Sequence, residues 1–199
     1  MSAPDLLAAL EPVVDVLERL GVRYQIGGSV ASSAYGMARA TMDVDLVADL
    51  GEHDVDALVQ ALGSDYFVAA DSAREAVKRR SSFNLIHQAT MLKVVVFVSE
   101  NRPYDTVALS RGRSETLVDE PGARAFRIAS PEDVVLAKLS WYRLGGEVSE
   151  VQWADVVGVL RVQREALDFA YLKEWAGQLE IDDLLARAAS AASRTRSGS

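Results

Sequence analysis

The stretch YQIGGSVASSAYGMARATMDVDLVADL, Tyr24 to Leu50, decides the fold. A short apolar run enters a Gly-Gly-Ser turn, and a segment of small residues follows. The alternating run that starts at Asp43 predicts a β-strand, in which residues i and i+2 lie on the same face. Asp43 and Asp45 therefore stand side by side. Aspartate is disfavoured in strands, so two in one short strand need a reason.

Binding of a divalent cation would explain the two aspartates. Two carboxylates at this spacing repel each other unless a cation lies between them. Mg²⁺ suits them because it takes oxygen ligands and shares its other positions with phosphates and water. The alternative is that Asp43 or Asp45 is an ordinary strand residue that faces solvent.

The Gly27-Gly28-Ser29 turn supplies the second half of the pattern. Glycines let the backbone approach a ligand closely, and a helix that starts at Ser29 would direct free N–H groups at an anion. A plain strand–turn–helix with Ser29 as N-cap is the alternative. Taken alone, the turn is a weak signal of a binding site. With Asp-x-Asp on the next strand the signal is more specific, because the glycines and Ser29 can hold a triphosphate and the aspartates can hold its metal.

The spacing of apolar residues gives the other elements. We expect helices at 3–20, 53–63, 72–80, 131–144, 149–161, 166–178 and 181–193, with a short helix inside 27–36 and a helical turn at 103–111. We expect strands at 22–26, 43–50, 66–70, 83–90, 91–100 and 126–130.

The fold class that follows is α/β (α+β), and the chain divides near residue 130. Residues 1–129 form a small mixed sheet with helices packed on it, residues 130–193 form a C-terminal helical bundle, and residues 194–199 form a disordered tail. Ser130 as N-cap and Pro131 at the first helical position mark the start of the helical part.

Composition limits the function further. Hydrophobic residues make up 49% of the 199 residues, enough for a real core. The absence of cysteine excludes disulfides and thiol nucleophiles and fits the cytoplasm. The net charge of -8 argues against a protein that coats nucleic acid, so tRNA is not a favoured partner. We expect no signal peptide, because the start of the sequence lacks a basic segment followed by an apolar core. We expect no membrane span either, because uninterrupted apolar runs such as VVVFV are far too short to cross a bilayer.

Gly28-Ser29, followed after about a dozen residues by Asp43-x-Asp45, resembles the pattern of the nucleotidyltransferase superfamily, whose fold is that of the polymerase-beta-like enzymes. The longer stretch IGGSVASSAYGMARATMDVDLV resembles minimal bacterial nucleotidyltransferases, including abortive-infection type toxins of toxin–antitoxin pairs. Arg39 and Thr41 match the Arg-x-Thr-x-Asp-x-Asp of that subgroup. The resemblance runs from roughly residue 20 to residue 185.

The resemblance implies transfer of a nucleoside monophosphate from a nucleoside triphosphate to a hydroxyl, with Mg²⁺ or Mn²⁺ as cofactor. Asp43 and Asp45 would be the catalytic and metal-binding residues. The nucleotide-binding residues that we expect are Gly27, Gly28, Ser29, Arg39, Thr41, Lys93 and Lys138. The acceptor could be a tRNA end, a protein hydroxyl or a small molecule such as an antibiotic, and a cognate antitoxin could be a partner.

One departure weakens the expectation of catalysis. The family places a third carboxylate in a Lys-x-Asp run, where this chain has Lys93-Val94-Val95, and no Asp or Glu occurs from Ala76 to Ser99. Glu100 and Asp71 are the alternatives. Without the third carboxylate, the chain could bind nucleotide without turnover, or it could be an interaction domain that has lost the ligand.

Three charged residues have an alternative structural interpretation. Lys93 could contact a phosphate or lie at the edge of its strand, and Lys138, which the resemblance places in the site, could equally snorkel from an amphipathic helix. Asp155 is matched by the same resemblance, but it could instead pair with Arg143 or be exposed.

Overall fold

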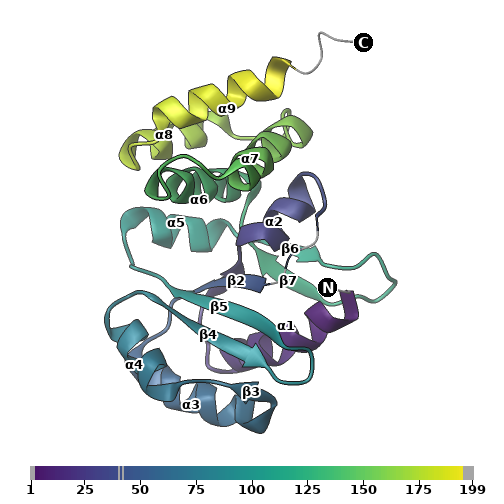
Figure 1. The fold of residues 1–199 in the computed structure, drawn as a ribbon, viewed down its shortest axis with the longest axis vertical. Coiled ribbons are helices and arrows are strands. Elements are labelled where there is room, and N and C mark those ends of the chain that lie inside the picture. Colours follow the sequence, from purple (N-terminus) through teal and green to yellow (C-terminus); the bar gives the residue numbers. More distant parts are fainter. Residues whose placement is uncertain (1–2, 40, 42, 195–199) are drawn as a thin grey trace. The chain divides into compact units, whose positions relative to one another are not determined.

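The computed structural model describes residues 3–39, 41 and 43–194, which form two compact units (Figure 1). Unit 1 comprises Met1–Gly27 and Ala40–Ile128, and unit 2 comprises Gly28–Arg39 and Ala129–Ser199. The boundary after Ile128 lies beside the division that we expect at residue 129, whereas the segment 28–39 groups with the C-terminal helices. Of the expected disordered tail, Arg194 ends a helix and 195–199 lie outside the described residues.

Unit 1 is built on a mixed sheet of seven strands in the order β3-β4-β5-β2-β1-β7-β6. The β2–β5 and β1–β7 pairs are parallel, and the other pairs are antiparallel. The strands are β1 (Tyr24–Ile26), β2 (Asp43–Ala48), β3 (Tyr66–Phe67), β4 (Ser82–His87), β5 (Leu92–Val98), β6 (Arg113–Thr116) and β7 (Ala125–Ile128).

Strands β2 and β5 are neighbours near the centre of this sheet, and each has one apolar face. Val44, Leu46 and Ala48 of β2 are fully buried, and the alternate residues are only partly buried. Strand β5 shows the same alternation, with Val94 and Val96 fully buried. Burial of each valine or leucine side chain stabilises the fold by about 1.5–3 kcal/mol, which determines which face of β2 is turned outward.

The helices of unit 1 are α1 (Ala3–Arg19), α3 (Glu52–Leu62), α4 (Ala70–Lys78) and α5 (Pro103–Arg111). In Figure 1, α3 and α4 lie on one side of β4 and β5, and α5 lies on the other. The hydroxyl of Tyr66 in β3 donates to the carbonyl oxygen of Ala9 in α1 at 2.9 Å, which ties the sheet edge to that helix.

Unit 2 contains α2 (Gly28–Tyr35), α6 (Pro131–Leu144), α7 (Glu150–Val162), α8 (Phe169–Gln178) and α9 (Asp182–Arg194). Helix α6 begins as predicted, since Ser130 Oγ accepts a hydrogen bond from the backbone N–H of Asp133. The backbones come close together at two glycines, Gly36, which directly follows α2, and Gly158 of α7. A Cβ at Gly36 would lie 3.0 Å from the backbone nitrogen of Val159 in α7. The small residues after the Gly-Gly-Ser turn permit this close approach.

The predicted class, a mixed sheet with packed helices followed by a helical region, is confirmed. Two elements differ from the prediction: residues 103–111 form a full helix, and Arg113–Thr116 form an edge strand that the sequence did not indicate. No helix in the described part of the chain has the length and hydrophobicity of a membrane span.

Candidate active site

Asp43 and Asp45 lie on the outward face of β2, as the alternation predicts. Asp43 is held from two sides. The hydroxyl of Thr41, a buried residue, lies 3.1 Å from both Oδ1 and the carbonyl oxygen of Asp43, and it can donate to them. The Nζ of Lys93 lies 3.7 Å from Oδ2 of Asp43. These contacts orient the first carboxylate of the pair.

The register of the parallel β2–β5 pair sets the neighbours of the two aspartates. Asp43 stands opposite Lys93, and Asp45 stands opposite Val95. On the far side of β5, Val95 is paired with Asn84. The residue beside Asp45 on the neighbouring strand is therefore a valine, where the resemblance requires a carboxylate.

Neither acidic alternative joins the pair. Asp71 is fully exposed on α4 and forms an ion pair with Arg74 at 2.7 Å. Glu100 follows β5, five residues beyond Val95 and hence about 16 Å along the strand direction, and it pairs with Arg102. Within the described ranges, no three Asp, Glu, His or Cys side chains gather as a metal site. The carboxylate pair alone suits one oxygen-ligated divalent cation that completes its shell with phosphates and water.

The two glycines have different roles. The N–H of Gly27 donates to the carbonyl oxygen of Asp45 at 2.8 Å, so this amide is already used in joining β1 to β2. Apart from Gly27 itself and its two chain neighbours, no described residue has an atom within 4 Å of a Cβ built at Gly27, so there is open space on that side of the backbone. Gly28 has φ 55°, a left-handed conformation that favours glycine, and it begins α2.

Unit 2 contains a cluster around the carboxylate of Asp155, a residue of α7. Lys138 of α6 donates from Nζ to its Oδ2 at 2.8 Å, and Arg39 donates from Nε to its Oδ1 at 3.1 Å. Ser32 of α2 donates to Oδ2 at 3.3 Å. A terminal nitrogen of Arg39 also donates to the hydroxyl of Ser29. Two of the predicted nucleotide-binding residues, Arg39 and Lys138, are thus joined through Asp155, and a third, Ser29, is bonded to Arg39.

Asp155 is charged in this cluster. Burial raises the pKa of its carboxyl, but hydrogen bonds from Arg39 and Lys138 outweigh burial and hold the pKa below its usual value. The side chains of Asp155 and Lys138 are only 7% and 8% exposed, so this ion pair is screened little by water. Two cations and one anion leave a net positive charge beside Ser29 at the start of α2, an arrangement that suits an anionic ligand.

Both alternatives weighed for Asp155 are wrong. Its side chain is only 7% exposed, and Arg143 pairs with Glu147 and Asp183 instead. Lys138 does not snorkel to solvent either. Asp155 was absent from the predicted site residues, and its match within the resemblance was the one signal that could have placed it there.

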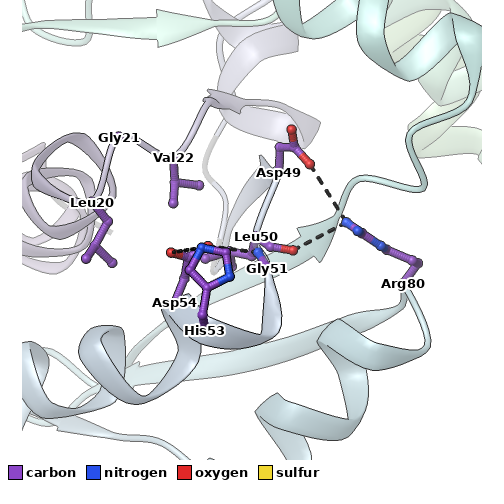
Figure 2. A pocket seen from close by; sticks show the side chains of 9 residues that line it. All are labelled: Leu20, Gly21, Val22, Asp49, Leu50, Gly51, His53, Asp54 and Arg80. Atoms are coloured by element: carbon purple, nitrogen blue, oxygen red, sulfur yellow. Dashed lines mark hydrogen bonds and ion pairs between the residues drawn. The ribbon is translucent and has the colours of Figure 1, made fainter.

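A cavity of about 290 Å³ lies at the opposite end of β2 (Figure 2). Asp49 and Leu50, which follow β2, line it together with Arg80, whose guanidinium donates to the carbonyl oxygen of Leu50 at 3.3 Å. Six residues of strand separate this end from Asp43, about 20 Å, so the cavity is no part of the carboxylate site.

No protein-family model matches this sequence, and no curated protein matches it. Solved structures do match. The antibiotic-resistance factor ANT(2'')-Ia is 15% identical, with a TM-score of 0.55 and 96% of both chains covered. An antigenic nucleotidyltransferase-like protein from Paracoccidioides brasiliensis is 17% identical, with a TM-score of 0.56 over 96% of this chain and 94% of its own. ANT(2'')-Ia in complex with adenylyl-2''-tobramycin gives a TM-score of 0.54 at 15% identity, over 90% and 98% of the chains.

At 15% to 17% identity, these likenesses establish the fold. The chain has the nucleotidyltransferase fold, which confirms the resemblance that the Gly-Ser and Asp-x-Asp pattern predicted. The narrower likeness to abortive-infection type toxins stays a prediction.

Proposed function

Since the chain has the nucleotidyltransferase fold, we propose that it binds a nucleoside triphosphate with Mg²⁺ or Mn²⁺ and transfers the nucleoside monophosphate to a hydroxyl acceptor. The observation that carries this proposal is the pair Asp43 and Asp45 on the outward face of a central strand. Such a pair is unfavourable without a cation, and its oxygen ligands are those that Mg²⁺ prefers.

In this proposal Asp43 and Asp45 hold the cation, and Thr41 and Lys93 orient Asp43. The cation, when bound, polarises the phosphate oxygens and offsets the charge that develops on them. Gly27 and Gly28 let the backbone lie close to the triphosphate.

We assign the triphosphate itself to Ser29, Arg39 and Lys138, as the resemblance implies. Arg39 and Lys138 both donate to Asp155, and the hydroxyl of Ser29 accepts from Arg39. Arg39 and Lys138 would shift part of their hydrogen bonding to phosphate oxygens as the ligand binds. The buried Asp155 would keep both cations in place in the absence of nucleotide. Positioning and charge compensation supply most of the rate in phosphoryl transfer.

The proposed reaction is a displacement at the α-phosphorus. The acceptor oxygen forms a bond to this phosphorus while the bond between the α- and β-phosphates breaks. Pyrophosphate leaves, and the proton of the acceptor hydroxyl passes to water. Arg39 and Lys138 stabilise the negative charge on the leaving pyrophosphate.

For the acceptor we favour a small molecule that carries positive charge. The net charge of -8 repels nucleic acid but attracts a cationic acceptor. ANT(2'')-Ia, which shares the fold, has been crystallised with adenylyl-2''-tobramycin. A panel of acceptors should therefore include aminoglycosides beside tRNA and Ser- or Tyr-containing peptides.

A second candidate function is nucleotide binding without turnover, as a sensor or as one component of a toxin–antitoxin type pair. Val95 opposite Asp45 favours it, because the position of the third carboxylate is apolar. The two candidates share the binding step and differ in the release of pyrophosphate.

Calorimetric titration with ATP, GTP, CTP and UTP, with and without Mg²⁺, tests the shared step. We expect one nucleotide to bind only with the metal, and the Asp43→Asn/Asp45→Asn variant to lose this binding. Asp49→Asn is the matched control, since Asp49 follows the same strand at its other end and pairs with Arg23. Equal binding by the double variant and the wild type would refute the site. Pyrophosphate release with the acceptor panel then separates the transferase from the binder.

A further inference from the structure

We propose that the ammonium group of Lys93 takes the electrostatic place of a second metal ion, so that the carboxylate pair works with a single divalent cation. This inference rests on the proposed function and concerns the same site. It follows from the ligand set, the register of the strands and the charge of the site.

The ligand set suits one cation only. A two-metal site holds its ions about 3.5–4 Å apart, and each ion needs oxygen ligands of its own. The strand beside Asp45 offers Val95 at that position, and the next strand offers Asn84, whose side chain is exposed. The sequence from Ala76 to Ser99, which includes both strands, contains no carboxylate.

Lys93 lies where a second cation would be useful. It is the register partner of Asp43, it shares the outward face with both aspartates, and its Nζ lies 3.7 Å from Asp43 Oδ2. Its side chain is 43% exposed, so the ammonium can turn toward a ligand without leaving the face. Lysine is a flexible point charge on a long stem, which suits this movement.

The charge of the site is consistent with a single metal. The Lys-x-Asp run of the family contains the lysine too, so three carboxylates, one lysine and two divalent cations carry a net charge of +2. Two aspartates, one lysine and one divalent cation carry a net charge of +1. Loss of the carboxylate together with one metal therefore lowers the net charge beside the triphosphate by only one unit, and the ammonium of Lys93 remains to offset the phosphate charge.

Removal of the ammonium should change metal and nucleotide binding in opposite directions. Without nucleotide, Lys93 pairs with Asp43 and competes with a metal for its oxygen. In Lys93→Met the affinity for Mn²⁺ in the absence of nucleotide should rise about two- to fivefold, because the metal no longer has to displace a part-exposed ion pair of that strength. With metal present, nucleotide affinity should fall about tenfold, because a phosphate loses a charge-assisted partner. A merely structural role for Lys93 would not produce opposite signs.

The test measures bound Mn²⁺ by electron paramagnetic resonance, with and without saturating nucleotide, on the full chain. The wild type should hold one Mn²⁺ per bound nucleotide, and Lys93→Met/Val95→Asp should hold two. Lys93→Arg keeps the charge and should resemble the wild type. Two Mn²⁺ per nucleotide in the wild type would overturn this inference and leave the proposed function standing. So would a Lys93→Met variant whose affinities for Mn²⁺ and for nucleotide are both unchanged. Absence of any metal-dependent nucleotide binding in the wild type would overturn the proposed function.

Discussion

The ion pair between Lys138 and Asp155 gives a prediction whose size follows from burial. Both side chains are more than nine-tenths buried, and their charged atoms lie 2.8 Å apart. Loss of one member of a buried pair leaves the other charge without compensation, at a cost of about 3–5 kcal/mol. We expect Asp155→Leu to lower the free energy of unfolding by about 3 kcal/mol, the lower end of that range. The lower end applies because the side chain of Arg39, the second partner of Asp155, is 34% exposed and can turn its charge to water when the carboxylate is removed.

The double variant should behave differently. In Lys138→Met/Asp155→Leu both buried charges are gone, and an apolar pair of similar volume is often neutral or stabilising. We expect the double variant to lie within about 1 kcal/mol of the wild type, so that the coupling between the two sites is large.

Tryptophan fluorescence during urea unfolding is the assay for this cycle. The three tryptophans, Trp141, Trp153 and Trp175, all lie in unit 2, so their signal reports on the unit that contains the pair. Additive losses in the double variant would refute the reasoning. So would an Asp155→Leu variant as stable as the wild type.

The pH dependence of the same pair has a definite sign. The pKa of Asp155 is lowered in the folded protein. Its contribution to the free energy of unfolding is therefore present above the unfolded pKa of about 3.9 and is lost as the pH falls through the folded pKa. The stability gap between the wild type and Asp155→Asn should stay constant from about pH 5 to 8 and shrink below about pH 4. A gap that narrows near neutral pH would contradict this assignment.

Three further predictions concern single side chains. Gly36→Ala would bring a Cβ within 3.0 Å of backbone atoms of α2 and α7 and should cost about 1–3 kcal/mol in urea unfolding, whereas Gly177→Ala, with no described atom within 4 Å of its Cβ, should be neutral or stabilising. Equal effects of the two would refute the close packing of these helices. Thr41→Val removes the hydroxyl that orients Asp43 and should weaken Mn²⁺ binding about tenfold, and unchanged binding would disprove that role. Gln25→Leu removes a buried Oε1 for which the described residues offer no hydrogen-bond partner; thermal unfolding should show equal or higher stability, and a clear loss would reveal a partner.

Local patterns predicted the elements that carry the carboxylate pair. Alternation around Asp43 and Asp45 predicted a strand with both aspartates on one face, and β2 has this geometry. Ser130 and Pro131 predicted the start of α6. These predictions were confirmed because the face of a strand and the cap of a helix depend on residues only a few positions apart in the sequence.

The features that were missed depend on partners outside their own segment, some of them distant in the sequence. Strand β6 has the polar sequence RSET, without an apolar run, and it exists through its pairing with β7. Asp155 meets Arg39 across 116 residues of sequence, a contact that no periodicity encodes. The grouping of 28–39 with the later helices has the same origin.

That grouping sets an order of events when the chain is synthesised. Helix α2 has eight residues, too few to be stable alone in water, and it packs on α6 and α7. At about 5–20 residues per second, a ribosome that has made Arg39 needs roughly 6–23 s more to reach Asp155. During that interval the segment after β1 has no partner, so a nascent chain released before α7 should leave 28–39 open to proteases while the sheet of unit 1 is already forming.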